Sequence, residues 1–354
     1  MTDGPGADAG DRIEAWRDHG RGARLLGSRA MDRRVVGTAL IVASAAGFGS
    51  GALFAKGVYA AGVDWIVLMA WRFLLGAGAT WAWILVSGGR RAALRRLARR
   101  EVLIGLGLGV LYVGNSGTYY AGLETVPASL ASLLVFVYPA IVAVLSLRFG
   151  RRLEGRRAWS ALGLALLGST LTIGGIRADE FPPLGPLLLV AASPFIYATW
   201  IVLQAWLTGE RSGTVGHDQA DGADASPVAA LVNTGAALTY WAIALAVARP
   251  VRPDQIPLEA WPGIVGVGFL STFVAIVGFV AGARRIGAAQ ASLISTIEPV
   301  WTVSLAALLL GESLTPVQLA GGALILLGVV IAQSAPVRGG RELEPAAALR
   351  IADE

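Results

Sequence analysis

Residues 291–306 have the sequence ASLISTIEPVWTVSLA, in which an acid, Glu298, directly precedes Pro299 in an otherwise apolar run. The apolar stretch 287–310 is long enough to cross a bilayer, because a crossing helix needs about 20 residues. Glu298 would then lie roughly 15 Å from either edge, at about 1.5 Å of rise per residue. A charge at that depth costs about 2.5–3.5 kcal/mol on insertion scales, so it is expected to face a partner or a wet cavity.

The same pattern occurs earlier in the chain, as ASLLVFVYPAIVAVLS at residues 131–146. Both stretches begin with Ala-Ser-Leu and hold a proline at the same place, so Tyr138 and Pro139 correspond to Glu298 and Pro299. Further on, ALGLALLGSTL (161–171) matches GGALILLGVVI (321–331) in the same register. The chain is therefore predicted to contain two copies of one unit.

The composition predicts an integral membrane protein. Of the 354 residues, 55% are hydrophobic and only 15% are charged, and the mean hydropathy is +0.62. Charge-poor runs of about 20 residues separate the charges, which is the pattern of membrane helices. About ten apolar segments are predicted, at 37–61, 64–88, 102–122, 128–149, 158–176, 184–206, 227–248, 260–283, 288–310 and 316–334.

These segments predict an all-α integral membrane fold of about ten transmembrane helices, arranged as two inverted five-helix repeats. A unit with an odd number of crossings must enter the membrane upside down in its second copy. Inverted repeats are common in alternating-access transporters, whose substrate site lies near the midplane between the copies. The predicted organisation is a disordered cytoplasmic tail (1–36), a first repeat (37–176), a second repeat (184–334) with a flexible acidic loop (207–226), and a cytoplasmic C-terminal tail (335–354).

The distribution of arginine sets the predicted orientation. The segments GGRRAALRRLARR (88–100) and GRRLEGRR (150–157) are strongly basic, whereas the turns AGVDW (61–65) and LETVPA (123–128) carry acids and no base. Because basic loops stay cytoplasmic, both termini are predicted to lie on the cytoplasmic side of the cell membrane. The acidic loop 207–226 and the bases Arg249 and Arg252 go against this trend.

Several classes of chemistry find no support in the sequence. The chain has no cysteine, and its two histidines lie in polar segments, so we expect neither a metal site nor a cofactor. No phosphate-binding loop or metalloprotease motif occurs, so transport would not be driven by ATP at a site on this chain. The net charge of +5 comes from arginines without interleaved aromatic residues, which argues against nucleic acid as a partner. The expected partners are a small-molecule substrate and the lipid bilayer, with the chain acting as a monomer or homodimer.

The two prolines and the acid suggest a cavity. Proline frees the carbonyls of Val135 and Ser295, and a free carbonyl at membrane depth needs protein, water or ligand as a partner. A simple kink satisfied by a neighbouring helix is the alternative for Pro139 and Pro299. For Glu298, the alternatives are a buried ion pair with an arginine and a site for a substrate ammonium group or a coupling proton.

Two cations complete the candidate site. Arg72 lies about 12 Å inside the second segment at about 1.5 Å per residue, and we expect it to hold a substrate carboxylate or to pair with Glu298. Lys56, near the end of the first segment, either joins the site or extends to the membrane interface. The polar residues predicted to shape the cavity are Tyr138, Tyr119, Asn115, Thr296 and Ser295. Gly105 and Gly109 are interpreted as helix-packing glycines.

At these motifs the sequence resembles the EamA-type permeases of the drug/metabolite transporter superfamily, over about residues 37–334. The resemblance rests on VYPAIVAVLSLRFG, on STIEPVWTVSLAALLLGESLT followed by QLAGGALILLGVVI, and on the looser FGSGALFAK and WRFLLGA. It implies a ten-helix bundle with a central cavity, in a family whose members mostly export amino acids, metabolites or toxic compounds. One departure is Arg151, which stands where the second copy has Glu312, and Glu312 is interpreted as a helix-end residue.

The leading hypothesis is a secondary transporter, and more specifically an exporter, of small polar metabolites such as amino acids. Proton coupling is left open. The alternatives are a membrane-embedded enzyme acting on a lipid-phase substrate, with Glu298 as general base, and a channel or scaffold. A second acid, a nucleophile or a metal cluster near Glu298 would be needed for the enzyme, and the sequence offers none.

Overall fold

The fold was analysed in a computed structural model that describes residues 8–146, 155–175, 181–207, 226–286, 291, 294–295 and 297–333. Within these ranges the chain forms helices and no strand. Six stretches are long and apolar enough to cross a membrane, namely the Arg34–Ala60 part of α1 (Asp8–Ala60), α2 (Trp65–Val86), α4 (Arg99–Leu123), α8 (Leu184–Leu207), α9 (Ser226–Ala246) and Leu258–Phe279. The remaining predicted segments contain shorter apolar helices. These are α5 (Ala128–Val135) followed by α6 (Tyr138–Ser146), α7 (Gly155–Gly174), α13 (Ile297–Leu310) and α14 (Pro316–Gln333).

The crossing that contains residues 260–283 is not a uniform helix. It consists of α10 (Trp261–Val265), a π-helix η6 (Gly266–Val274) and α11 (Ala275–Ile286). Within η6, Thr272 Oγ1 donates to the carbonyl of Val267, five residues earlier, at 2.9 Å. Segments with the wider π-helical turn are rare and are often found at functional sites.

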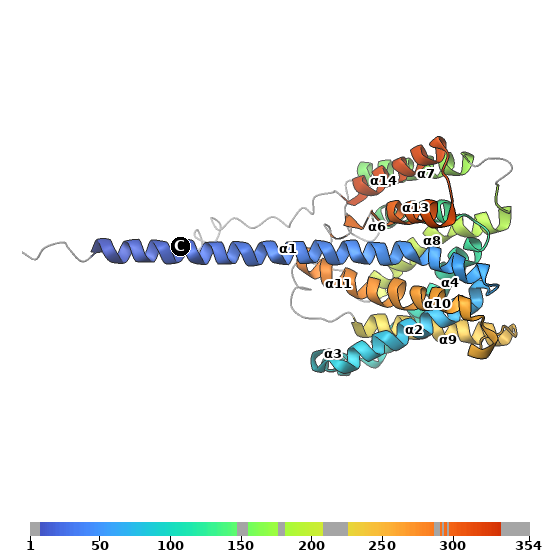
Figure 1. The fold of residues 1–354 in the computed structure, drawn as a ribbon, viewed down its shortest axis with the longest axis horizontal. Helices are drawn as coiled ribbons and strands as arrows, with labels where there is room; N and C mark the ends of the chain where they lie inside the picture. Colours follow the sequence, from blue (N-terminus) through green and yellow to red (C-terminus); the bar gives the residue numbers. More distant parts are fainter. Residues whose placement is uncertain are drawn as a thin grey trace, which may run out of the picture.

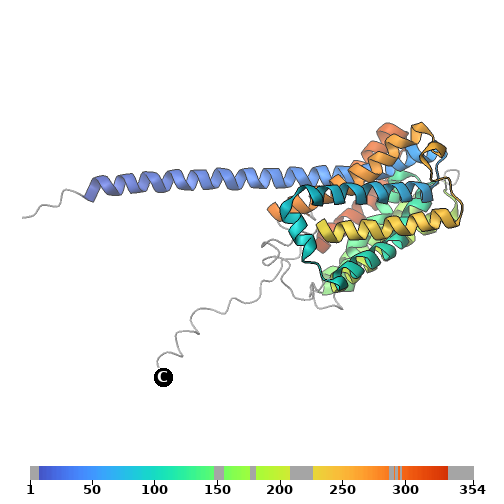
Figure 2. The same ribbon diagram turned by 90° about the horizontal axis from the view of Figure 1, so that it is seen from below.

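Most helices of one copy pack against helices of the other copy (Figures 1 and 2). α1 packs on η6 and α11, and its counterpart α8 packs on α4. α1 also packs on α13, as α8 packs on α6, and α2 packs on η6, as α9 packs on α4. The remaining major contacts join matching helices, α2 with α9, α7 with α14, and α5 with α13. Each copy therefore completes its packing with the other, and the predicted fold of two inverted repeats is confirmed.

The same relation holds for individual side chains. Ser44 Oγ on α1 donates to the carbonyl of Ala275 at 2.6 Å, and Ser193 Oγ on α8 donates to Asn115 Oδ1 at 3.0 Å. Asn115 and Ala275 are 160 positions apart (275 minus 115), which is the offset of the sequence repeat. The two serines thus make corresponding links between the first helix of one copy and the third helix of the other.

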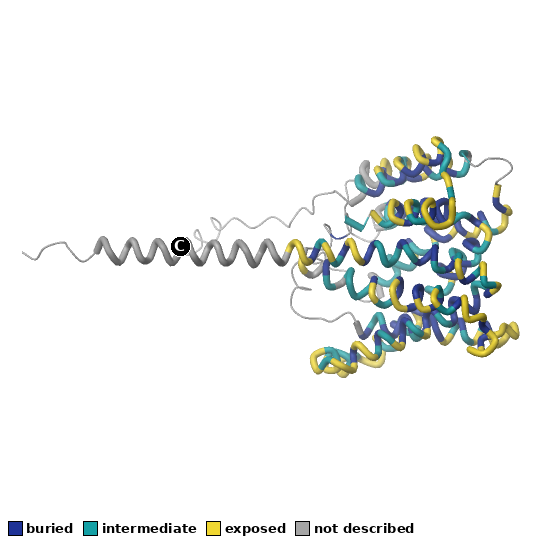
Figure 3. Tube along the Cα trace, in the orientation of Figure 1, coloured by how far each residue is buried: buried dark blue, intermediate teal, exposed yellow. Residues whose placement is uncertain are grey.

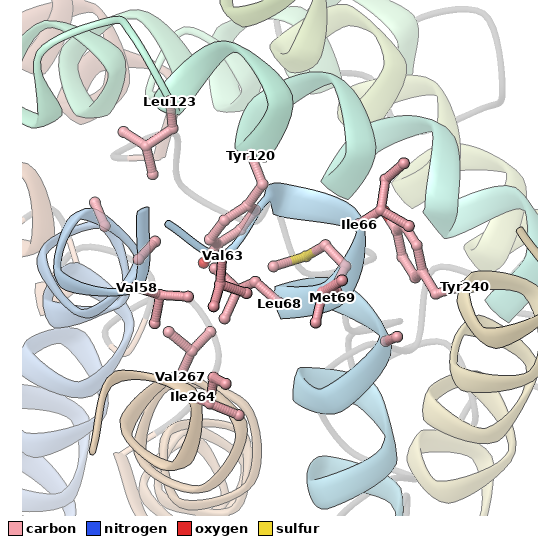
Figure 4. Packing of buried hydrophobic residues seen from close by; sticks show 14 of the residues in the cluster. Val58, Val63, Ile66, Leu68, Met69, Tyr120, Leu123, Tyr240, Ile264 and Val267 are labelled. Atoms are coloured by element: carbon pink, nitrogen blue, oxygen red, sulfur yellow. The ribbon is translucent and has the colours of Figure 1, made fainter. Parts of the chain in front are cut away.

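Buried apolar residues hold the bundle together. The larger cluster joins α1, α2, α4 and η6 through side chains such as Val58, Leu68, Tyr120 and Val267 (Figure 4). A smaller cluster joins α5, α6, α7 and α14, and includes Leu133, Ile141, Ala161 and Ile325. Many large apolar side chains are exposed instead, for example Leu308 at 78% and Leu238 at 64%. Exposed and buried stretches alternate along the helices of the bundle (Figure 3). Their exposure suits a surface that faces lipid rather than water.

Close packing through glycine is confirmed between α4 and α9. A Cβ added at Gly105 would lie 2.8 Å from Leu231 Cβ, and one at Gly109 would meet the backbone of Val232. These glycines let the two helix backbones approach, which also removes any reason to interpret them as a nucleotide-binding motif.

Two segments differ from the prediction. Residues 8–36 were expected to be disordered, whereas α1 begins at Asp8 and continues without a break to Ala60. A formed helix adds one hydrogen bond for each further residue, and no proline interrupts residues 8–60. The basic segment after α2 forms a helix of its own, α3 (Gly88–Arg95), where a loop was expected.

Some expectations lie outside the described residues. These are the acidic loop at 208–225, the C-terminal tail 335–354, Arg151 and Thr296.

Candidate functional site

The chain breaks its helix just before the proline in both copies. In the first copy α5 ends at Val135, residues 136–137 form a turn, and α6 begins at Tyr138, directly before Pro139. In the second copy Ser295 lies in a turn and α13 begins at Ile297, two residues before Pro299. Proline donates no hydrogen bond and suits the first turn of a helix, which explains why a new helix starts there.

Glu298 consequently lies in the first turn of α13 rather than inside a continuous helix. Its backbone is held against α1, because Thr302 Oγ1 bridges the carbonyls of Gly49 and Glu298 at 2.9 and 3.1 Å. Trp301 Nε1 also donates to Ser50 Oγ at 3.1 Å. The FGSG segment of α1 thus fixes the acid in place, and its glycine allows the approach, since a Cβ at Gly49 would lie 2.8 Å from Thr302 Oγ1.

Glu298 lies within electrostatic range of tyrosines on three other helices. The carboxylate interacts electrostatically with the hydroxyls of Tyr119 on α4, Tyr138 on α6 and Tyr197 on α8. The acid therefore lies within reach of groups from both copies. All four side chains are half-buried, so none is completely sealed by packing.

The rings form a wall on one side of the acid. Tyr138 and Tyr197 lie 4.7 Å apart between ring centroids, and Tyr197 stacks on Trp200 at 6.1 Å. Tyr112 contacts both Trp200, at 4.9 Å, and Tyr197, at 6.2 Å. Aromatic faces attract cations and apolar groups, so this wall, made by α4, α6 and α8, can contact a substrate beside its charged group.

Arg72 is a second ionisable group within electrostatic range of Tyr119 and Tyr197. It is buried on α2, with its guanidinium 4.7 Å from the ring centroid of Tyr120 and 5.1 Å from that of Phe73. Its Nε donates to Thr272 Oγ1 in the π-helix at 3.0 Å. Tyr119 and Tyr197 interact electrostatically with both Arg72 and Glu298.

Among the described residues, Arg72 and Glu298 make no ion pair with each other or with any other residue. The predicted alternative of a buried Arg72–Glu298 pair is therefore not what the structure shows. An acidic and a basic side chain thus lie near the same tyrosines without an ion pair between them. A buried ionisable group without a partner is costly unless it is neutral or meets water or a ligand.

The other polar residues predicted for the site fall into two groups. Tyr138, Tyr119 and Ser295 are half-buried near the acid, and Ser295 Oγ donates to the carbonyl of Ala291 at 3.0 Å. Asn115 is buried, and its Oδ1 accepts the bond from Ser193, which gives it a role in packing α4 on α8. Thr296 is outside the described residues.

Lys56 and Glu312 belong to one end of the bundle. Glu312 Oε1 and Oε2 accept hydrogen bonds from the backbone N–H groups of Ala128 and Ser129, both at 2.8 Å. The prediction that Glu312 is a helix-end residue is confirmed, although the helix it caps is α5, in the other copy. Lys56 interacts electrostatically with Glu312 and is half-buried.

A pocket of about 240 Å³ opens at this end, lined by residues that include Ser129, Pro182, Glu312 and Gln318. It is separate from Glu298, because α13 runs from Glu298 to Leu310 between the two acids, 12 positions (310 minus 298) or about 18 Å at about 1.5 Å per residue.

Sequence reasoning did not select Tyr112, Tyr120, Trp200 or Thr272. Aromatic and hydroxyl residues are common in membrane helices, and most of them serve packing. The available signal was their spacing. Tyr112, Tyr119 and Tyr120 lie at helical intervals along α4, and Tyr197 and Trp200 are three positions apart on α8, so each set can share a face.

Comparison with known proteins agrees with this architecture. The model of the EamA-like transporter family matches the chain twice, at residues 35–174 and 184–333. The uncharacterized transporter YcbK of Bacillus subtilis is 25% identical over 80% of this chain and 88% of its own length. An uncharacterized transporter of Archaeoglobus fulgidus is 26% identical over 64% of this chain and 75% of its own length.

A solved structure, described only as "Crystal structure of protein", has the same fold with a TM-score of 0.55, at 20% identity over 85% of this chain and 97% of its own. The family and the names of the relatives indicate a transporter, not an enzyme. The chain is a multi-pass membrane protein and belongs to the EamA-like transporter family.

Proposed function

We propose that this transporter carries a small zwitterion, with amino acids as the first candidates, through a cavity between its two copies. The observation that supports this most is that Arg72 and Glu298 share the same tyrosines without pairing with each other. A zwitterion would neutralise both charges at once, and neither an anion nor a cation alone would do so.

In this proposal Glu298 binds the ammonium group or, between substrates, a coupling proton. Arg72 binds the carboxylate, and Tyr138, Tyr119, Ser295 and Thr296 shape the space between them. Lys56 lies nearer the end of the bundle and would attract the carboxylate along the path. The rings of Tyr197 and Trp200 would contact the substrate side chain.

The helix breaks support alternating access as the mechanism. In each copy a helix begins beside the proline, α6 after the separate helix α5 in the first copy and α13 in the second, and α5–α6 and α13 pack against the opposite copy. Broken helices at the interface of inverted repeats are typical of transporters that rock one copy against the other around a fixed site. Export is the direction that the resemblance implies.

The charge distribution supports an orientation in the cell membrane with both termini inside. Most described arginines outside the site lie at the end of the bundle where α2 ends and α11 ends, for example Arg91, Arg95 and Arg285. At the opposite end Arg249 pairs with Asp64 at 3.4 Å and Arg252 with Asp254 at 3.1 Å. The two arginines that go against the trend are therefore neutralised, which agrees with the positive-inside rule.

The test begins with a thermal-shift screen of the purified protein against the twenty amino acids, because a ligand that binds the folded state raises its Tm. The best hit is then compared with the matching amine, which lacks the carboxylate, and the matching acid, which lacks the ammonium group. Glu298→Gln should weaken binding of the amino acid and of the amine, but not of the acid. Arg72→Gln should weaken binding of the amino acid and of the acid, but not of the amine.

Each loss should be about 10- to 100-fold, since a hydrogen bond to a charged group contributes about 1.5–3 kcal/mol. Leu308→Gln, on the exposed surface of α13, controls for a general effect of a polar substitution. If both site variants bind all three compounds as the wild type does, or lose all three equally while remaining folded, the assignment of the two charges is wrong.

A further inference from the structure

The segment between α2 and α4 carries the densest charge in the described part of the chain. It comprises α3 and the first turn of α4, and its arginines are Arg90, Arg91, Arg95, Arg96, Arg99 and Arg100. We call it the basic segment. Because α2 and α4 both cross the membrane, the residues that join them must lie at its surface.

The basic segment has two distinct faces. Ala93, Leu94 and Leu97 are half-buried, as is Arg90 one turn earlier, whereas Arg91 and Arg95 are exposed. Residues spaced by three or four lie on one side of a helix, so α3 presents an apolar side and a cationic side. A short helix with this division lies in the plane of the membrane interface, with its apolar side toward the acyl chains.

Trp83 fixes the depth of this segment. Trp83 lies in the last turn of α2, and the guanidinium of Arg90 stacks over its ring at 3.9 Å from the centroid. Arg90 Nη1 also donates to the carbonyl of Trp83 at 2.8 Å. Tryptophan prefers the level of the lipid headgroups, so α3 lies at the level where lipid phosphates are found.

The exposed arginines lack counter-charges among the described residues. Arg91, Arg95, Arg96, Arg99 and Arg100 make no ion pair with any part of the chain that the structure describes. Glu101 is the one described acid in this neighbourhood, and its carboxylate accepts the backbone N–H of Ala98 at 2.7 Å at the start of α4. Five other described acids, Asp64, Glu124, Asp254, Glu259 and Glu312, lie at the opposite end of the bundle.

We propose that the basic segment is a binding site for the headgroups of anionic phospholipids. Guanidinium groups bind phosphate oxygens through two parallel hydrogen bonds, and a basic residue near an anionic membrane contributes about 1 kcal/mol. Five exposed arginines at headgroup level match several negative headgroups at once. The site includes the start of α4, the helix that also carries Tyr119.

The test uses the full chain purified in a non-ionic detergent, with the thermal shift measured on adding phosphatidylglycerol or phosphatidylcholine. Phosphatidylglycerol should raise the Tm more than phosphatidylcholine does, and the difference should shrink at about 0.5 M salt, where screening shortens the range of these charges. Inorganic phosphate at the same concentration should give no such increment, which distinguishes a lipid headgroup from free phosphate.

Three variants sharpen the test. Replacing Arg91, Arg95, Arg96, Arg99 and Arg100 with glutamine should remove roughly half or more of the phosphatidylglycerol increment, because each charge contributes separately. Replacing the same five with lysine should keep most of it. Arg249→Gln with Arg252→Gln removes bases from the opposite end and should leave it unchanged.

If the five-glutamine chain does not fold, Arg95→Gln with Arg96→Gln serves in its place, with a proportionally smaller loss. Equal shifts with the two lipids in the wild type would overturn the proposal, as would an unchanged increment in the glutamine variant. A loss of the increment in the Arg249 and Arg252 variant of the same size would also overturn it, because the effect would then depend on net charge alone.

Discussion

Gly49 is the residue at which α1 comes closest to the backbone of Glu298. A Cβ at this position would lie 2.8 Å from Thr302 Oγ1 and 3.0 Å from the carbonyl oxygen of Glu298. We predict that Gly49→Ala destabilises the protein, because overpacking costs about 1–3 kcal/mol and exceeds the gain in helix propensity of about 1 kcal/mol. The Tm of the purified variant measures this.

Gly57 on the same helix is the matched control, since a Cβ there would meet nothing within 4 Å. Gly57→Ala should leave the Tm unchanged or raise it. If Gly49→Ala is as stable as Gly57→Ala, the close contact between α1 and α13 does not exist as described.

At the residue scale, the sequence identified the charges and missed most of their neighbours. Glu298 and Arg72 stood out because an ionisable group in a membrane segment is costly and therefore rare. Tyr112 and Thr272 did not stand out, because which face of a helix looks inward depends on packing. The absence of an ion pair between the two charges could not be predicted either, since it depends on distances across four helices.

Glu312 shows how one side chain stabilises an element of the other copy. Its two oxygens cap α5 at Ala128 and Ser129. We predict that Glu312→Ala lowers stability by about 0.5–2 kcal/mol, the usual cost of losing a helix cap, which corresponds to a decrease in Tm of roughly 2–4 °C per kcal/mol in a large chain. Glu312→Gln should cost less, because its amide oxygen can still accept one of the two bonds.

Glu259→Ala is the control, since this acid is exposed in the segment before α10. A Tm of the Glu312→Ala variant equal to that of the Glu259→Ala variant would show that the cap contributes nothing to stability.

At the element scale, a helix break beside Pro139 and Pro299 was foreseeable because proline removes a backbone donor. The π-helix η6 was not foreseeable, because residues 266–274 contain no proline and read as one apolar run. The helix α3 was missed for a different reason. Its arginines were used only to predict the orientation in the membrane. The apolar residues between them, Ala93, Leu94 and Leu97, are too few to predict an amphipathic helix.

At the scale of the whole molecule, the repeat in the sequence was sufficient to predict inversion, because each copy has an odd number of crossings. The pairing of helices was not predictable from the repeat, since side-by-side copies could share the same sequence pattern. The structure shows that α1 packs on the third helix of the other copy and that α8 does the same in return. The proposed mechanism requires the two copies, packed in this way, to rock against each other around the proposed site.

The most direct test of this account is whether the proposed cavity beside Glu298 can be reached from each side of the membrane. The chain contains no cysteine, so a single Ser295→Cys gives one thiol near the acid, and Leu308→Cys gives a control thiol on the exposed surface of α13. A charged, membrane-impermeant thiol reagent is applied to sealed vesicles of either orientation. We predict that Ser295→Cys reacts from both sides, that the bound amino acid slows the reaction, and that Leu308→Cys reacts from neither. A Ser295→Cys thiol that reacts from neither side would contradict a water-accessible pocket, and one that reacts from a single side with and without ligand would contradict alternating access.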